Sequence, residues 1–187
     1  MIRVTAVAQD RARALLQPAD LAVDATAGKG IDTAMLAECV RPDGRVWACD
    51  VQEVALQHTR TLLETLGLAH LVRLVHDGHE HLPQWLPECA HGKLTLAMFN
   101  LGYLPTGDKT LTTRSDTTLR ALDAAWQSLR PGGALSVVCY PGHEAGTTEA
   151  QSVEQWVETL DGAHVDAVKP TGTQRPSPFL LWIEKVR

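Results

Sequence analysis

The sequence predicts an α/β fold, with a mostly parallel seven-stranded sheet, helices on both faces and an antiparallel hairpin at one end. Short apolar runs alternate with amphipathic stretches along the chain, which is typical of strand–helix–strand units around a buried parallel sheet. The last two apolar runs are different, because a segment rich in Pro, Gly and Thr joins them and no helix fits there. Strands joined without a crossover helix pair antiparallel.

Hydrophobic periodicity locates each expected element. Buried parallel strands are expected at 21–26, 45–50, 71–76, 94–99 and 134–140. Amphipathic helices are expected at 32–40, 53–66, 113–129 and 148–160, with a shorter helix within 79–86. The closing hairpin is expected to consist of strands at 164–169 and 179–186.

The composition is that of a globular protein. The chain has 187 residues, of which 44% are hydrophobic and 21% charged, and this fits one domain spanning 1–187. The four cysteines form no Cys-x-x-Cys pair, so we expect reduced thiols in a cytoplasmic protein. No secretory signal is recognisable, and no apolar run reaches the roughly 20 residues that span a bilayer. The net charge of −5 means that any contact with nucleic acid needs a local basic face.

A glycine loop follows the first expected strand. Gly28 and Gly30 lie between this strand and the next helix, where glycines let the backbone approach a ligand closely. Asp50 ends the second strand, 20 residues after Gly30. A carboxylate at this place is expected to bind a ribose diol.

The charges around this loop favour S-adenosylmethionine over NAD. Asp24 ends the first strand and Asp32 begins the helix, so two carboxylates lie beside the loop. They would repel a pyrophosphate but suit a cationic sulfonium and an ammonium group. Thr33 stands where a dinucleotide fold has its third glycine. The alternative role of Asp32 is a favourable interaction with the helix dipole.

The segment 76–81, after the third strand, contains three histidines and two acids. Its spacing matches no metal motif, so we expect no metal. We expect it beside the adenine of the cofactor, where Asp77 or the Gly78 backbone binds the adenine edge and His79 packs on the ring. A solvated loop remains the alternative for the first and last histidines.

Residues 100–103, Asn-Leu-Gly-Tyr, follow the fourth strand, at the sheet edge where ligands bind. This segment is similar to the Asn-Pro-Pro-Tyr loop of amino-group methyltransferases. The Asn100 side-chain oxygen and the Leu101 carbonyl can accept N–H bonds from an amine and aim its lone pair at a methyl carbon. Tyr103 can pack on a flat base. The alternatives are a turn cap for Asn100 and a core position for Tyr103.

Polar residues after the fourth and fifth strands complete the expected acceptor site. Lys109 and Arg114 offer a local positive face for phosphates, although charges in such loops are often only solvated. Asp108 or His143 can take the proton that the amine loses. A structural role for His143 is the alternative.

The chain resembles, nearly end to end, a family of small methyltransferases labelled as rRNA methylases. The matching segments are 23–26, 28–33, 50–52, 99–105, 107–109, 112–113, 142–143, 178–179 and 183–185. The resemblance implies the Rossmann-like class I methyltransferase fold. It places the family's cofactor contacts on Lys29, Asp32, Asp50, Gln52, Gly78 and His79. The family commonly has Asn in place of Lys29, so Lys29 contributes either its backbone alone or an amine that reaches the methionine carboxylate. The family commonly has Ser in place of Gly78, so Gly78 can contribute only its backbone.

Members of this family methylate the 5-aminomethyl group of 2-thiouridine at the wobble position of transfer RNA. The resemblance therefore implies S-adenosylmethionine as cofactor, the anticodon region of a tRNA as partner, and often a homodimer. Three other functions stay open from the residues. They are methylation of rRNA or of a small amine, an NAD-dependent oxidoreductase, and a non-catalytic RNA-binding protein.

Overall fold

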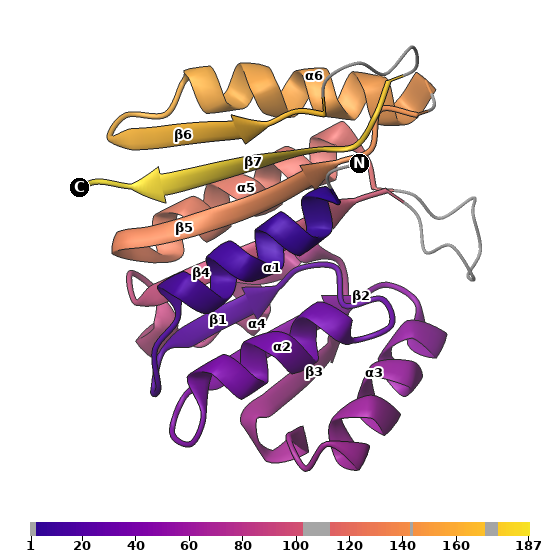
Figure 1. The fold of residues 1–187 in the computed structure, drawn as a ribbon, viewed down its shortest axis with the longest axis vertical. Coiled ribbons are helices and arrows are strands. Elements are labelled where there is room, and N and C mark those ends of the chain that lie inside the picture. The colour runs from indigo at the N-terminus through magenta and orange to yellow at the C-terminus, as the bar shows by residue number, and fades with distance from the viewer. Residues whose placement is uncertain (1–2, 103–112, 143, 171–175) are drawn as a thin grey trace.

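The computed structural model describes residues 3–102, 113–142, 144–170 and 176–187. Its centre is a seven-stranded sheet in the order β3-β2-β1-β4-β5-β7-β6 (Figure 1). The strands are β1 (Leu21–Asp24), β2 (Arg45–Asp50), β3 (Val72–His76), β4 (Leu94–Leu101), β5 (Leu129–Cys139), β6 (Ala163–Val168) and β7 (Phe179–Lys185). Strands β1 to β5 pair in parallel, and β7 is antiparallel to both β5 and β6. This confirms the predicted sheet and its hairpin.

Helices cover both faces of the sheet, and each face has its own apolar core. One face is covered by α1 (Val4–Leu15), α2 (Ile31–Val40) and α3 (Glu53–Thr65). The other is covered by α4 (Leu82–Trp85), α5 (Ser115–Ser128) and α6 (Glu144–Glu158). Short 3-10 turns are η1 (Ala69–Leu71), η2 (His79–His81) and η3 (Glu88–Ala90). In the part of the chain that the structure describes, no helix is long and apolar enough to cross a membrane.

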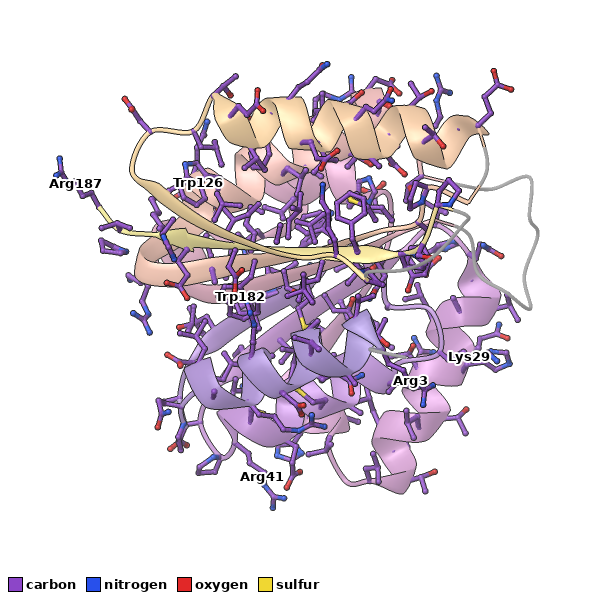
Figure 2. The ribbon with its side chains drawn as sticks, turned by 45° about the horizontal axis from the view of Figure 1, so that its top comes forward. Arg3, Lys29, Arg41, Trp126, Trp182 and Arg187 are labelled. Carbon is purple, nitrogen blue, oxygen red and sulfur yellow. The ribbon has the colours of Figure 1, made fainter. Side chains whose placement is uncertain are left out.

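Helix α1 was not among the predicted elements. Its buried face consists of Val4, Ala8 and Ala12, and small alanines at every fourth position give only a weak amphipathic signal. Arg11 anchors the helix to the far end of the sheet. Its guanidinium is 2.5 Å from a carboxylate oxygen of Asp166 in β6 and 5.9 Å from the ring centroid of Trp182 in β7. Figure 2 shows this tryptophan on the sheet face that carries α1.

Strand β5 and helix α6 begin well before the positions that the sequence predicts. Strand β5 begins at Leu129, because a register shift against β4 between Leu94 and Leu96 admits the Pro-Gly-Gly segment into the strand. Helix α6 begins at Glu144. Its first turns contain a glycine and two threonines, which are weak helix formers, so the sequence does not indicate a helix there. Both shifts lengthen elements and leave the order of the fold unchanged.

Candidate active site

The carboxyl ends of three adjacent strands gather polar groups at one edge of the sheet. Asp24 ends β1, Asp50 ends β2, and Asn100 lies one residue before the end of β4. Strand β1 lies between the other two and pairs in parallel with both. Ligands in open α/β sheets bind at this edge, so the structure brings the predicted loop, acid and amide residues together.

The glycine loop has a conformation that requires glycine. Gly28 and Gly30 have φ angles of 54° and 79°, in the left-handed region that other residues avoid. A Cβ on Gly30 would lie 2.8 Å from the backbone Cα of Thr59 in α3. Asp50 holds the loop from the other side, because its two oxygens accept hydrogen bonds from the Gly28 and Gln52 backbone N–H groups, both at 2.9 Å. The loop that joins β1 to α2 is thus held in place by contacts with Asp50 at the end of β2 and with Thr59 of α3.

Asp24 is fully buried under this loop. Its carboxylate accepts hydrogen bonds from the Thr33 hydroxyl at 2.6 Å and from the Thr26 backbone N–H at 3.2 Å. Burial, and next the negative charge of Asp32, raise the pKa of Asp24 from 3.8 to about 7. Both oxygens are engaged within the protein, so Asp24 anchors the loop internally. Its direct contact with a cofactor stays a prediction.

Asp32, in the first turn of α2, bridges two amide side chains. Its Oδ2 accepts a hydrogen bond from Asn100 Nδ2 at 2.8 Å, and its Oδ1 accepts one from Gln9 Nε2 of α1 at 2.6 Å. The Asn100 backbone N–H donates to Thr26 Oγ1 at 2.8 Å. A carboxylate oxygen accepts hydrogen bonds, so the amide nitrogen of Asn100 faces Asp32. Among the residues that the structure describes, no donor occupies the carbonyl oxygen of this amide. Leu101, which follows Asn100, is buried.

The turn after β3 is held by its own side chains. Asp77 Oδ1 accepts a hydrogen bond from the Gly78 backbone N–H at 2.8 Å and lies 2.7 Å from His81 Nδ1. The hydrogen bond to His81 lowers the pKa of Asp77, and the same bond raises the pKa of His81. The pair is exposed to solvent, so its contribution to stability is small.

His79 differs from the other histidines of this turn because only 8% of it is exposed. Its ring packs edge-on against Phe99 of β4, with the ring centroids 6.0 Å apart. Burial lowers its pKa, so the ring is neutral at pH 7. Its Nε2 atom is buried and has no hydrogen-bond partner within the described residues. Because buried polar atoms are normally paired, this nitrogen supports the prediction of a ligand beside His79.

The remaining predicted site residues are less defined. Lys29 is exposed on the glycine loop (Figure 2), and Arg114 is exposed just before α5, 3.3 Å from Asp116. Tyr103, Asp108, Lys109 and His143 lie outside the described residues. Within the described ranges, no group of three or more His, Cys, Asp or Glu side chains is placed to hold a metal ion.

Two further residues border the site and were not singled out from the sequence. Tyr140 follows β5, and its ring would lie 3.6 Å from a Cβ on Gly102. Glu149 of α6 is 2% exposed and accepts hydrogen bonds from the Thr113 and Thr118 hydroxyls, both at 2.6 Å. Glu149 shares the buried face of α6 with the small and apolar positions of that helix, and an acid on a buried face is the signal that could have identified it.

The site fits a cationic cofactor. Asp24, Asp32 and Asp50 place three carboxyl groups at one sheet edge, around a loop whose cation, Lys29, is exposed. A pyrophosphate would meet electrostatic repulsion there, whereas a sulfonium and an ammonium would be attracted. His79 Nε2, which has no partner in the described part of the chain, offers an additional acceptor.

Comparison with known proteins agrees with this geometry. A family profile described as "Putative rRNA methylase" matches residues 46–184. A curated relative from Arabidopsis thaliana, the chloroplastic tRNA (mnm(5)s(2)U34)-methyltransferase, is 39% identical over 180 residues, or 91% of this chain. The chain spans 65% of that relative's length.

Solved structures resemble this chain over nearly its whole length. A putative rRNA-methylase from Clostridium thermocellum superposes with a TM-score of 0.93 at 34% identity, covering 99% of this chain and 98% of that one. A putative methyltransferase from Streptococcus mutans, solved in complex with SAH, has a TM-score of 0.87 at 33% identity, with 99% of each chain covered. The chain therefore belongs to the family described as putative rRNA methylases, and its fold is that of the class I S-adenosylmethionine-dependent methyltransferases.

Proposed function

We propose that this protein is an S-adenosylmethionine-dependent N-methyltransferase that converts 5-aminomethyl-2-thiouridine to 5-methylaminomethyl-2-thiouridine at the wobble position of tRNA. The observation that carries the proposal is the orientation of the Asn100 amide. Its nitrogen donates to Asp32, so its carbonyl oxygen is available to an acceptor that carries N–H groups. The name of the Arabidopsis relative supports the substrate, and the SAH-bound structure supports the cofactor.

When bound, the cofactor supplies an electrophilic methyl group on a positively charged sulfur. In the proposed arrangement the Asp50 carboxylate accepts hydrogen bonds from the ribose hydroxyls, since it lies at the end of β2 beside the Gly28 backbone. His79 and Gly78 border the adenine, and Asp32 offers its negative charge to the methionine ammonium. Lys29, which is exposed, can reach the methionine carboxylate, and Gln52 lies beyond Asp50 on the same turn.

The acceptor must be an uncharged amine, because only the neutral form has a lone pair. A primary alkylamine has a pKa of roughly 10, so its deprotonation at pH 7 costs about 4 kcal/mol. Partial desolvation at the sheet edge and the nearby sulfonium reduce this cost. The Asn100 oxygen then accepts an N–H bond from the neutral amine and holds its lone pair in line with the methyl carbon. Asp108 or His143 takes the proton that the product releases.

The proposed RNA partner must meet a local basic surface, because the chain carries a net charge of −5. Lys29 and Arg114 are exposed on segments that leave the carboxyl edge of the sheet. Figure 2 shows Arg3, just before α1, on the same side of the molecule as Lys29. Of these cations, Arg3 and Arg114, together with Lys109, are proposed to contact the phosphates of the anticodon region.

Nucleoside mass spectrometry of tRNA from cells that lack the gene tests the substrate. We expect unmethylated 5-aminomethyl-2-thiouridine to accumulate, and reintroduction of the wild-type gene to restore the methyl group. A normal wobble profile, or loss of a methyl group from ribosomal RNA alone, would refute the tRNA assignment.

The Asn100→Ala variant tests the reaction centre. We expect turnover to fall about 100-fold or more, while the dissociation constant for S-adenosylmethionine stays near the wild-type value. Gln127→Ala, which replaces an exposed glutamine near the far end of α5, is the control and should leave both quantities unchanged. Full turnover of Asn100→Ala at unchanged cofactor affinity would show that the reaction centre lies elsewhere.

A further inference from the structure

Helix α1 contributes one side chain to the predicted reaction centre. Gln9 Nε2 donates to Asp32 Oδ1 at 2.6 Å, and Asp32 Oδ2 accepts from Asn100 Nδ2 at 2.8 Å. We propose that Gln9 is a positioning residue for methyl transfer. Through Asp32, it holds the Asn100 amide in the orientation that leaves the carbonyl oxygen free for the acceptor amine. This inference rests on the proposed role of Asn100.

The orientation of the Asn100 amide decides whether its oxygen or its nitrogen faces the substrate amine. With the observed orientation, the carbonyl oxygen accepts an N–H bond and leaves the amine lone pair free to attack. With the reverse orientation, the amide would donate a hydrogen bond to that lone pair and block it. The reverse orientation would also bring the Asn100 oxygen against a carboxylate oxygen of Asp32, where both atoms are acceptors. The hydrogen bond to a charged group therefore selects the productive orientation by about tenfold or more.

Asp32 can select this orientation only if its own carboxylate is held. It lies in the first turn of α2, so its backbone is fixed while its carboxylate can still rotate. One oxygen is engaged by Asn100, and the hydrogen bond from Gln9 to the other oxygen removes the remaining freedom. Asn100 is restrained independently through its backbone N–H, which donates to Thr26 Oγ1 at 2.8 Å.

Gln9 stands on a rigid support. Its neighbour Ala8 is buried against the sheet, and Arg11 joins the same helix to Asp166 and Trp182. Side chains carried by a packed helix hold a site more accurately than side chains carried by a loop. Gln9 is also uncharged, so it restrains Asp32 without neutralising the negative charge that a cationic cofactor would meet. A lysine or arginine would supply a donor but cancel that charge.

The first test is the Gln9→Ala variant, assayed in the steady state with saturating S-adenosylmethionine and the proposed tRNA. We expect kcat to fall about tenfold, while the dissociation constant for S-adenosylmethionine changes less than twofold. Gln127→Ala is the matched control and should be unchanged. Wild-type kcat in Gln9→Ala, or an equal loss of kcat and cofactor affinity, would overturn the inference.

A double-mutant cycle links Gln9 to Asn100. If Gln9 acts through the Asn100 amide, Gln9→Ala should cost nothing further in the Asn100→Ala background. Full additivity of the two losses would overturn the inference. The cycle also separates the two proposals. If Asn100→Ala is active, the proposed reaction centre fails, whereas if only Gln9→Ala is active, the inference about Gln9 fails alone.

Gln9→Glu keeps the shape of the side chain and adds a pH-dependent readout. An ionised glutamate cannot donate to Asp32, but its protonated form can. The neighbouring carboxyl groups of Asp32 and Asp24 favour that protonated form. The ratio of kcat for Gln9→Glu to kcat for Gln9→Ala should therefore rise several-fold from pH 8 to about pH 5. A ratio that is constant over this range would overturn the inference. If Gln9→Ala fails to fold, wild type replaces it in the ratio, and a constant ratio of kcat for Gln9→Glu to kcat for wild type would equally overturn the inference.

Discussion

Replacement of the buried Asp24 by asparagine should stabilise the protein at alkaline pH. Asp24 is fully buried, and burial and Asp32 raise its pKa from 3.8 to about 7. The folded protein therefore binds a proton that the unfolded chain has already lost, and the free energy of unfolding falls as pH rises between these two values. At about 1.36 kcal/mol per pKa unit, the whole difference corresponds to about 4 kcal/mol.

Asp24→Asn removes this loss and preserves the local contacts. The amide oxygen can accept from the Thr26 N–H, and the amide nitrogen can donate to the Thr33 hydroxyl, which also accepts hydrogen bonds. The difference in unfolding free energy between variant and wild type should widen by about 3 kcal/mol from pH 5 to pH 8. Urea denaturation followed by fluorescence of the five tryptophans measures it. A difference that stays constant over this range, or a variant less stable than wild type at pH 8, would refute the account of Asp24.

Three further predictions concern the loop, the ribose site and the buried acid. Gly30→Ala should lower the free energy of unfolding by about 3 kcal/mol, because its Cβ would clash with Thr59, whereas Gly67→Ala, with a similar φ but open space, should cost about 1 kcal/mol. Asp50→Ala should raise the dissociation constant for S-adenosylmethionine about tenfold or more in calorimetry, and a normal constant would remove Asp50 from the ribose site. Glu149→Ala should lower the free energy of unfolding by about 3 kcal/mol, because it leaves the Thr113 and Thr118 hydroxyls without their acceptor. Thermal unfolding measures this, and wild-type stability would contradict it.

Local patterns were sufficient to predict most of the sheet. The strands of the centre are short apolar runs, and their turns carry glycine or acids, so Asp50 and Asn100 could be placed at the carboxyl edge from spacing alone. Helix α1 was not predicted, because Ala8 and Ala12 bury little apolar area and give only a weak amphipathic pattern. The position of β7 between β5 and β6 depends on pairing between distant segments, which the hairpin signal does not contain.

The contacts of the candidate site were harder to predict than its members. Asp32 was expected beside a cofactor, yet it also joins Gln9 and Asn100. Asp24 was expected near the same ligand, but Thr33 and Thr26 occupy its oxygens. Hydrogen-bond partners depend on the three-dimensional distance between side chains, and no sequence period records that distance. Residue type and strand position therefore predicted where the site is, while its internal bonding needed the structure.

The bridge through Asp32 also has a consequence for folding. Gln9 and Asp32 are 23 positions apart in the chain, and Asp32 and Asn100 are 68 apart. Neither hydrogen bond can form before α1 and the central strands have assembled, because contacts of such sequence separation appear only with tertiary structure. A partly folded chain would therefore possess every residue of the centre and still lack its geometry. Turnover should therefore be lost over the same range of denaturant concentration in which the protein unfolds cooperatively.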